Sequence, residues 1–103
     1  MKYEVVKDLS VDLDIETKTK EPSFFQVIVH NDDFTPMEFV VGILEKFFYM
    51  DRREATEKML EAHTQGKTEV GVFTKDVAET KISQVIDYAR THEHPLICSM
   101  EAA

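Results

Sequence analysis

The chain has 103 residues, of which 43% are hydrophobic and 31% are charged, and its net charge at pH 7 is −8. This length allows one domain with a modest core, and the composition is ordinary for a water-soluble protein. The acidic charge argues against nucleic acid or an anionic membrane as a partner, because both require a basic surface.

The chain contains no apolar run long enough for a membrane span and no apolar core of a signal peptide near its start. Cys98 is the only cysteine, so no disulfide framework is expected. A reducing compartment is therefore favoured, and we expect a cytoplasmic protein.

Residues 1–22 differ in character from the rest of the chain. They contain ten charged residues, and Leu9, Val11, Leu13 and Ile15 alternate with polar residues. This alternation is typical of a strand, but an isolated amphipathic strand has nothing to pair with. We expect a mobile N-terminal extension over residues 1–22, able to bind a partner, and a folded domain over residues 23–103.

The folded domain begins with a predicted strand over residues 23–30. It is apolar on both faces except at Gln26, which is typical of a strand in the interior of a sheet. Asn31, Asp32 and Asp33 then favour a turn, because their short side chains bond to nearby backbone.

A helix is predicted from about Pro36 to Tyr49. Thr35, Pro36 and Glu38 have the spacing of a capping box, with Thr35 as N-cap and Glu38 as the third helical residue. The apolar stripe of this helix consists of Phe39, Val40, Ile43, Leu44, Phe47 and Phe48.

A second helix should begin at Asp51, with Glu54 three residues later, and end at Gly66 in a left-handed cap. Its inward face is expected to carry Ala55, Met59, Ala62 and His63.

The rest of the chain predicts strand, helix and strand. Residues 68–74 form the second strand, with Gly71 as a bulge or close contact. Thr74 can cap a helix over residues 75–91, which His94-Pro95 ends, and residues 96–100 form the third strand. The buried stripe of that helix consists of Ala78, Ile82, Val85 and Ala89. The order β-α-α-β-α-β indicates a small α+β domain with one three-stranded antiparallel sheet packed against three helices.

Little in the sequence indicates catalysis. His63 lies on an apolar helix face, where most histidines only pack, and no serine or threonine has the setting of a nucleophile. Cys98 is expected to lie in the interior of the third strand, where it would only pack. A metal site from His30, Asp32 and Asp33 stays open as an alternative, although neighbouring strand residues point in opposite directions. A phosphate loop is excluded, because this turn has no glycine and is acidic.

A cavity lined by Met37 and Met59 would have a distinct chemistry, although methionine is more often core filler. With Asn31, Asp33 and His63 at its mouth, it would take an apolar side chain inside and hold a small cation at its rim.

Five sequence blocks resemble the ClpS family of adaptors, which deliver N-degron substrates to the AAA+ unfoldases ClpA or ClpC. They are Asn31-Asp32-Asp33-Phe34-Thr35-Pro36-Met37-Glu38-Phe39-Val40, Lys58-Met59-Leu60 through His63, Gln65-Gly66-Lys67, Gly71-Val72-Phe73-Thr74 with Val77-Ala78-Glu79-Thr80-Lys81, and His94-Pro95-Leu96. The blocks occur in the order of the family and span about residues 23–101, whereas residues 1–22 match no pattern.

The resemblance implies a non-enzymatic protein that recognises a free N-terminal Phe, Tyr, Trp or Leu, without a cofactor, and works as a monomer. It implies that Asn31, Asp33 and His63 meet the α-amino group. It implies a side-chain pocket lined by Thr35, Met37, Val40, Met59, Ala62 and Leu96. Some relatives have a larger aliphatic residue at the position of Ala62, so the pocket is expected to fit Leu less closely than aromatic side chains.

The resemblance also implies that Asp76 and Lys81 face the unfoldase, and that residues 1–22 engage it separately. Two other functions remain as alternatives. The first is a protein-interaction domain that regulates the unfoldase without reading N-termini. The second is a hydrolase that uses His63.

Overall fold

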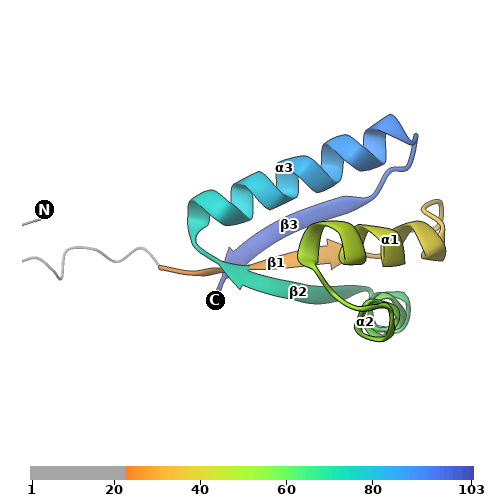
Figure 1. Cartoon of the computed structure of the whole chain (residues 1–103), viewed down its shortest axis with the longest axis horizontal. Coiled ribbons are helices and arrows are strands. Elements are labelled where there is room, and N and C mark those ends of the chain that lie inside the picture. Colours follow the sequence, from red (N-terminus) through yellow and green to blue (C-terminus); the bar gives the residue numbers. More distant parts are fainter. Residues whose placement is uncertain (1–22) are drawn as a thin grey trace, which may run out of the picture.

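The structure is a computed structural model, and it describes residues 23–103. Its elements are β1 (Phe25–His30), α1 (Met37–Phe48), α2 (Arg52–Gln65), β2 (Lys67–Phe73), α3 (Lys75–Thr91) and β3 (Ile97–Ala102), arranged as in Figure 1. This confirms the predicted α+β fold and element order. The expected mobile extension over residues 1–22 lies outside the described residues.

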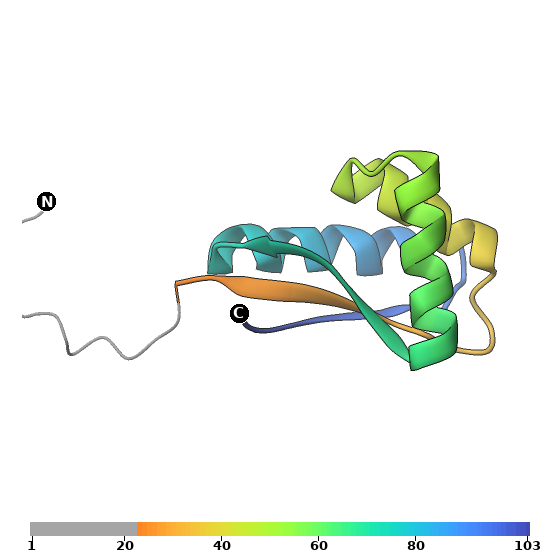
Figure 2. The ribbon, with the colours of Figure 1, turned by 90° about the horizontal axis from the view of Figure 1, so that it is seen from below.

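The three strands form one antiparallel sheet in the order β2-β1-β3, so β1 is the central strand, as its apolar faces predicted. Val29 pairs with Thr68 on one side and with Cys98 on the other, and all three are buried. Figure 2 shows α1 and α3 on one side of the sheet, whereas α2 runs from that layer down to the end of β2. Within residues 23–103, no helix is long and apolar enough to cross a membrane.

The predicted irregularity at Gly71 is confirmed. Val27 pairs with Gly71 and Ile28 with Glu69, so Val70 is an extra residue in β2. A β-carbon on Gly71 would come within 2.6 Å of the Phe73 ring. Glycine at this position therefore allows the close approach of the Phe73 ring next to the bulge.

The core lies between the sheet and the helices. Its largest fully buried side chains are Val27, Val29, Val41, Ile43, Leu44 and Val85. Each stabilises the fold by roughly 1.5–3 kcal/mol through burial. The predicted stripes of α1 and α3 face this core, with Ile82 and the three phenylalanines of α1 only partly buried.

The capping box predicted at Thr35 is wrong. α1 begins at Met37 with Pro36 at the N-cap position, and no side chain caps it. The Thr35 hydroxyl instead donates to Asp32 Oδ2 at 2.8 Å, and the Glu38 carboxylate pairs with Arg52. A hydroxyl bonds more strongly as donor to a charged carboxylate than as acceptor from a backbone N–H, which explains the difference.

The ends of α2 are as predicted. Asp51 is the N-cap and accepts from the Glu54 N–H at 2.8 Å, and Gly66 ends the helix with φ 93°. Thr74 occupies the N-cap position of α3, but its hydroxyl makes no cap bond.

Candidate functional site

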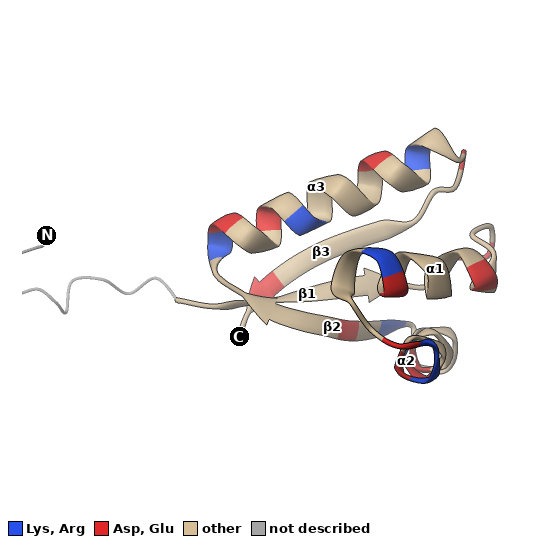
Figure 3. Ribbon diagram, viewed as in Figure 1, with Lys and Arg blue, Asp and Glu red and all other residues tan. Residues whose placement is uncertain are grey.

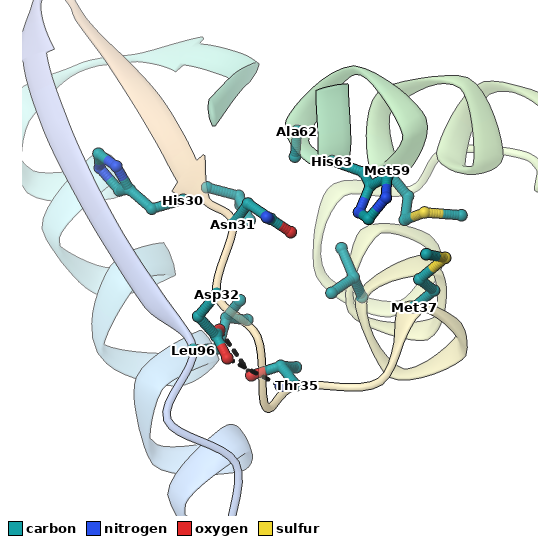
Figure 4. Close-up of a pocket in the computed structure, with 11 residues that line it drawn as sticks. His30, Asn31, Asp32, Thr35, Met37, Met59, Ala62, His63 and Leu96 are labelled. Atoms are coloured by element: carbon teal, nitrogen blue, oxygen red, sulfur yellow. Dashed lines mark hydrogen bonds between the residues drawn. The ribbon is translucent and has the colours of Figure 1, made fainter. Parts of the chain in front are cut away.

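A pocket lies where the end of β1, the turn after it, α1, α2 and the start of β3 meet (Figure 4). It is lined by Val29, His30, Asn31, Asp32, Thr35, Met37, Val40, Met59, Ala62, His63 and Leu96. The structure thus brings together all six residues of the expected side-chain pocket, with Asn31 and His63. Asp33 is exposed and is not part of the lining.

The inner wall of the pocket is apolar and buried. Val40 from α1, Ala62 from α2 and Leu96 before β3 are 9%, 3% and 5% exposed. These three residues come from segments far apart in the chain, so only the packing of α1 and α2 on the sheet forms this wall.

Two methionines stand at the outer part of the pocket. Met37, in the first turn of α1, is 48% exposed, and Met59 of α2 is half-buried. They leave a free volume of about 10 Å³, room for about one water molecule. A larger side chain enters only if these thioethers rotate, and methionine has three rotatable bonds for this.

Asn31 and His63 form the mouth, and both are exposed. Figure 4 shows the Asn31 side chain pointing toward the His63 ring. The Asn31 backbone N–H donates to the Gly66 carbonyl at 2.9 Å, which ties the end of β1 to the end of α2. This bond fixes the two residues of the mouth relative to each other.

Asp32 organises the turn that borders the pocket. Its carboxylate accepts from the Phe34 N–H, the Thr35 N–H and the Thr35 hydroxyl, each at 2.8 Å. Partial burial acts to raise the pKa of Asp32, but these hydrogen bonds and the charge of nearby His94 hold the pKa below its usual value of 3.8. The group is therefore an anion at neutral pH.

The bond to Asp32 sets what Thr35 offers to a ligand. Its hydroxyl hydrogen is used by Asp32 Oδ2, so only lone pairs remain. Together with the Asp32 charge, this favours a ligand that carries donors and positive charge.

The sequence reasoning placed Asp32 in the turn but missed it as a lining residue, together with Val29 and His30. The spacing of Asp32 and Thr35 could have indicated the bond, because an aspartate side chain often accepts from backbone a few residues on. The His30 ring faces Ser99, with Nε2 and Oγ 2.7 Å apart. Across residues 23–103, no three metal-ligating side chains form a cluster, so the metal-site alternative has no support.

The remaining reactive groups do not make a catalytic site. The lining contains no serine or cysteine, and the Thr35 hydroxyl is bonded to Asp32 rather than to His63. Burial raises the pKa of Cys98 to about 12, so this thiol stays protonated and unreactive.

Asp76 and Lys81 of α3 are not part of this pocket. They line a separate groove together with Tyr49, Val77, Thr80 and Gln84. The Lys81 ammonium donates to the Phe47 carbonyl at 2.7 Å, so its charge is directed at the end of α1.

The fold and pocket define a small α+β domain with a binding pocket between its helices and its sheet. The sequence model of the family described as "ATP-dependent Clp protease adaptor protein ClpS" matches residues 20–99. The chain therefore belongs to the ClpS family, the adaptor proteins of the ATP-dependent Clp protease.

Individual relatives agree. The chain is 60% identical over 84 residues to ClpS 1 of Rhizobium meliloti, covering 82% of this chain and 72% of the relative. It is 56% identical over 86 residues to ClpS of Alkalilimnicola ehrlichii, covering 84% of this chain and 81% of the relative. A solved structure of Agrobacterium tumefaciens ClpS2, bound to L-phenylalaninamide, is similar with a TM-score of 0.77 and 34% identity. The match covers 81% of this chain and 100% of that chain.

Proposed function

We propose that this chain binds the free N-terminal Phe, Tyr, Trp or Leu of N-degron substrates. It then delivers them to a ClpA- or ClpC-type unfoldase for degradation by ClpP, and modulates the substrate choice of the unfoldase. The observation that carries the proposal is an apolar pocket with hydrogen-bond acceptors and a carboxylate around its mouth. The similar ClpS2 structure supports it, because phenylalaninamide combines a free α-amino group with an aromatic side chain.

The α-amino group is assigned to Asn31, Asp33 and His63. With a pKa of about 7.7–8.0, it is mostly an ammonium at pH 7 and offers three donors. The Asn31 amide oxygen and a neutral His63 nitrogen each accept one. Asp33 is exposed in the turn after β1, and its carboxylate would accept the third directly or through a water molecule.

The side chain of the first residue is assigned to the buried wall formed by Val40, Ala62 and Leu96, with Thr35 and the two methionines around it. Burying a Phe or Leu side chain contributes roughly 1.5–3 kcal/mol before the costs of binding. That alone gives weak affinity, so the bonds to the ammonium supply the discrimination against internal residues and blocked N-termini.

Acetylation of the substrate amine tests this assignment. It deletes the charge and two donors and leaves the acceptors unpaired, which costs about 1–3 kcal/mol. We expect an acetylated Phe-initiated peptide to bind about tenfold more weakly, or worse, than the free peptide in fluorescence anisotropy titrations. Affinities within twofold of each other would contradict the pocket assignment. If no N-degron peptide binds but the unfoldase does, the chain regulates the unfoldase without reading N-termini.

The proposal includes a second surface for the unfoldase, with Asp76 and Lys81 of α3 on it. The protein would act as a monomer in the cytoplasm without a cofactor. Asp76 is exposed at the start of α3, in the separate groove described above. Substrate and unfoldase can therefore bind at the same time, which an adaptor requires.

A further inference from the structure

Tyr49 is the most exposed large hydrophobic residue of residues 23–103, with 84% of its surface open to solvent. Its backbone is also unusual, with φ 57° and ψ 29° in the left-handed region. The Met50 N–H donates to the Leu44 carbonyl at 3.3 Å across it, in a helix-end geometry where glycine is the common residue. A residue with a β-carbon is disfavoured in this backbone conformation, and an exposed aromatic ring adds little burial to offset that cost. Such strained, exposed positions are candidates for function.

The Lys81 ammonium packs against the face of the Tyr49 ring. Its ammonium lies 4.8 Å from the centroid of the Tyr49 ring and 5.8 Å from that of Phe48. The same ammonium donates to the Phe47 carbonyl at 2.7 Å. Its contacts thus stabilise the last turn of α1 and orient the tyrosine. Because the Lys81 ammonium already makes these contacts, fewer of its hydrogen-bond donors are available to a partner than in an extended surface lysine.

The groove beside Tyr49 has an apolar and an acidic part. Val77, 43% exposed, lies along the groove with Tyr49. A second groove continues along α3 and shares Asp76, Thr80 and Gln84 with the first, adding Glu79. Figure 3 shows acidic residues in the first half of α3, after a basic residue at the start of the helix. Because the Lys81 ammonium is directed toward α1, the remaining charged side chains that line the two grooves are Asp76 and Glu79.

We propose that Tyr49 is the apolar anchor of the surface that docks on the unfoldase, and that Lys81 acts there as a positioning residue for the Tyr49 ring. The proposal rests on the proposed function, since it concerns the unfoldase-facing groove of that same adaptor. The complementary patch on the partner has an apolar side chain that packs on Tyr49 and Val77, and a basic residue that pairs with Asp76 or Glu79. Tyrosines in such settings commonly dominate binding energy.

The first test compares substitutions of Tyr49 in the full-length chain. Binding of each fluorescently labelled variant to an intact ClpA hexamer, and to a ClpC hexamer, is measured by anisotropy. Tyr49→Ala should weaken docking about tenfold or more, whereas Tyr49→Phe keeps the ring and should stay within about twofold. Tyr49→Gly suits the left-handed backbone, so it should fold at least as stably as wild type and still dock as poorly as Tyr49→Ala. Val72→Ala, which trims another exposed apolar residue on β2, serves as the matched control. Docking of Tyr49→Ala and Tyr49→Gly with wild-type affinity would overturn the proposal.

A double-mutant cycle tests the role of Lys81. Lys81→Met removes the ammonium and keeps most of the aliphatic stem. As a positioning residue, Lys81 should matter only while the ring is present. The substitution should therefore weaken docking about threefold or more in wild type, and by less than about twofold in Tyr49→Ala. An equal loss in both backgrounds would show that Lys81 contacts the partner directly and would overturn the positioning role.

Peptide binding separates this proposal from the proposed function. Tyr49 and Lys81 do not line the substrate pocket, so all these variants should bind a Phe-initiated peptide like wild type. Normal peptide binding together with unimpaired docking of Tyr49→Ala refutes the anchor alone. A wild-type protein that binds neither hexamer refutes the proposed partner and the anchor with it.

Discussion

Asp32→Asn is a sharp test of how the pocket is built. The substitution keeps the size of the side chain and one oxygen, which can still accept from the Phe34 and Thr35 N–H groups. It removes the charge and places either an oxygen or an NH₂ group opposite the Thr35 hydroxyl. If Oδ1 keeps its two backbone bonds, the NH₂ group donates to Thr35 and the hydroxyl must turn its hydrogen elsewhere.

The expected loss of stability follows from these bonds. A hydrogen bond to a charged group contributes about 1.5–3 kcal/mol and a neutral one about 0.5–1.5 kcal/mol. The turn is only partly buried, so the difference over the two backbone bonds amounts to about 1 kcal/mol. For a domain of this size, the melting temperature should fall by about 4–8 °C.

Substrate binding should fall as well. The Thr35 hydroxyl would point a hydrogen, rather than a lone pair, toward the pocket, and the mouth would lose a negative charge. We expect a Phe-initiated peptide to bind about tenfold more weakly at pH 7, which corresponds to ~1.4 kcal/mol. Anisotropy titration gives the affinity and thermal unfolding gives the stability.

The pH dependence adds a third readout. Because the pKa of folded Asp32 lies below 3.8, the stabilisation is fully present above that pH and is lost as the pH falls through the folded value. The variant should lack this part of the acid destabilisation. Asp33→Asn is the matched control, because no hydrogen bond within residues 23–103 involves the exposed Asp33 carboxylate, and its melting temperature should not change. Equal stability and equal peptide affinity of Asp32→Asn and wild type would refute the reasoning.

Three further predictions concern selectivity, pH and the N-terminal extension. Met37→Ala should allow Ile- and Val-initiated peptides to bind, with a modest loss of affinity for Phe, because the Met37 thioether excludes a branched β-carbon at a cost of about 1–3 kcal/mol. If the variant instead binds Phe-, Leu-, Ile- and Val-initiated peptides more weakly in parallel, Met37 lines the pocket without selecting among them. Peptide affinity should fall between pH 7 and pH 5.5, because protonation of the His63 ring would remove its acceptor and repel the substrate ammonium, and His63→Ala should flatten this dependence. A flat wild-type profile would mean that His63 only packs. Deleting residues 1–20 should leave the melting temperature and peptide affinity unchanged, because β1 begins only at Phe25, but delivery of a substrate to the unfoldase should fail. If the truncated protein does not fold, the domain boundary at residue 23 is wrong.

Local chemistry in the sequence was sufficient for the elements and their order. The apolar stripes, the Asp51 cap, Gly66 at the end of α2 and Gly71 at the bulge depend on residues a few positions apart. The apolar residues of β1, interrupted only by Gln26, also indicated a strand in the interior of the sheet, and β1 is the central strand. The family, too, was recognisable from short blocks of sequence.

The capping box shows where local rules fail. Thr35 and Glu38 have the right spacing, but each side chain has a better partner. Asp32 is close enough to Thr35 in sequence for its bond to have been considered. Arg52 lies 14 residues from Glu38 and reaches it only because the connection after α1 folds back. A spacing rule cannot weigh such competing partners.

The sequence by itself determined the elements, the fold class and the residues from which a binding site would be built. Only the tertiary structure decided that Asp32 rather than Asp33 lines the pocket, that two methionines nearly close it, and that the Lys81 charge is turned toward α1. The reason is physical. Periodicity and capping act within a few residues, whereas the direction of a side chain and the volume left between elements depend on how α1, α2 and α3 pack on the sheet.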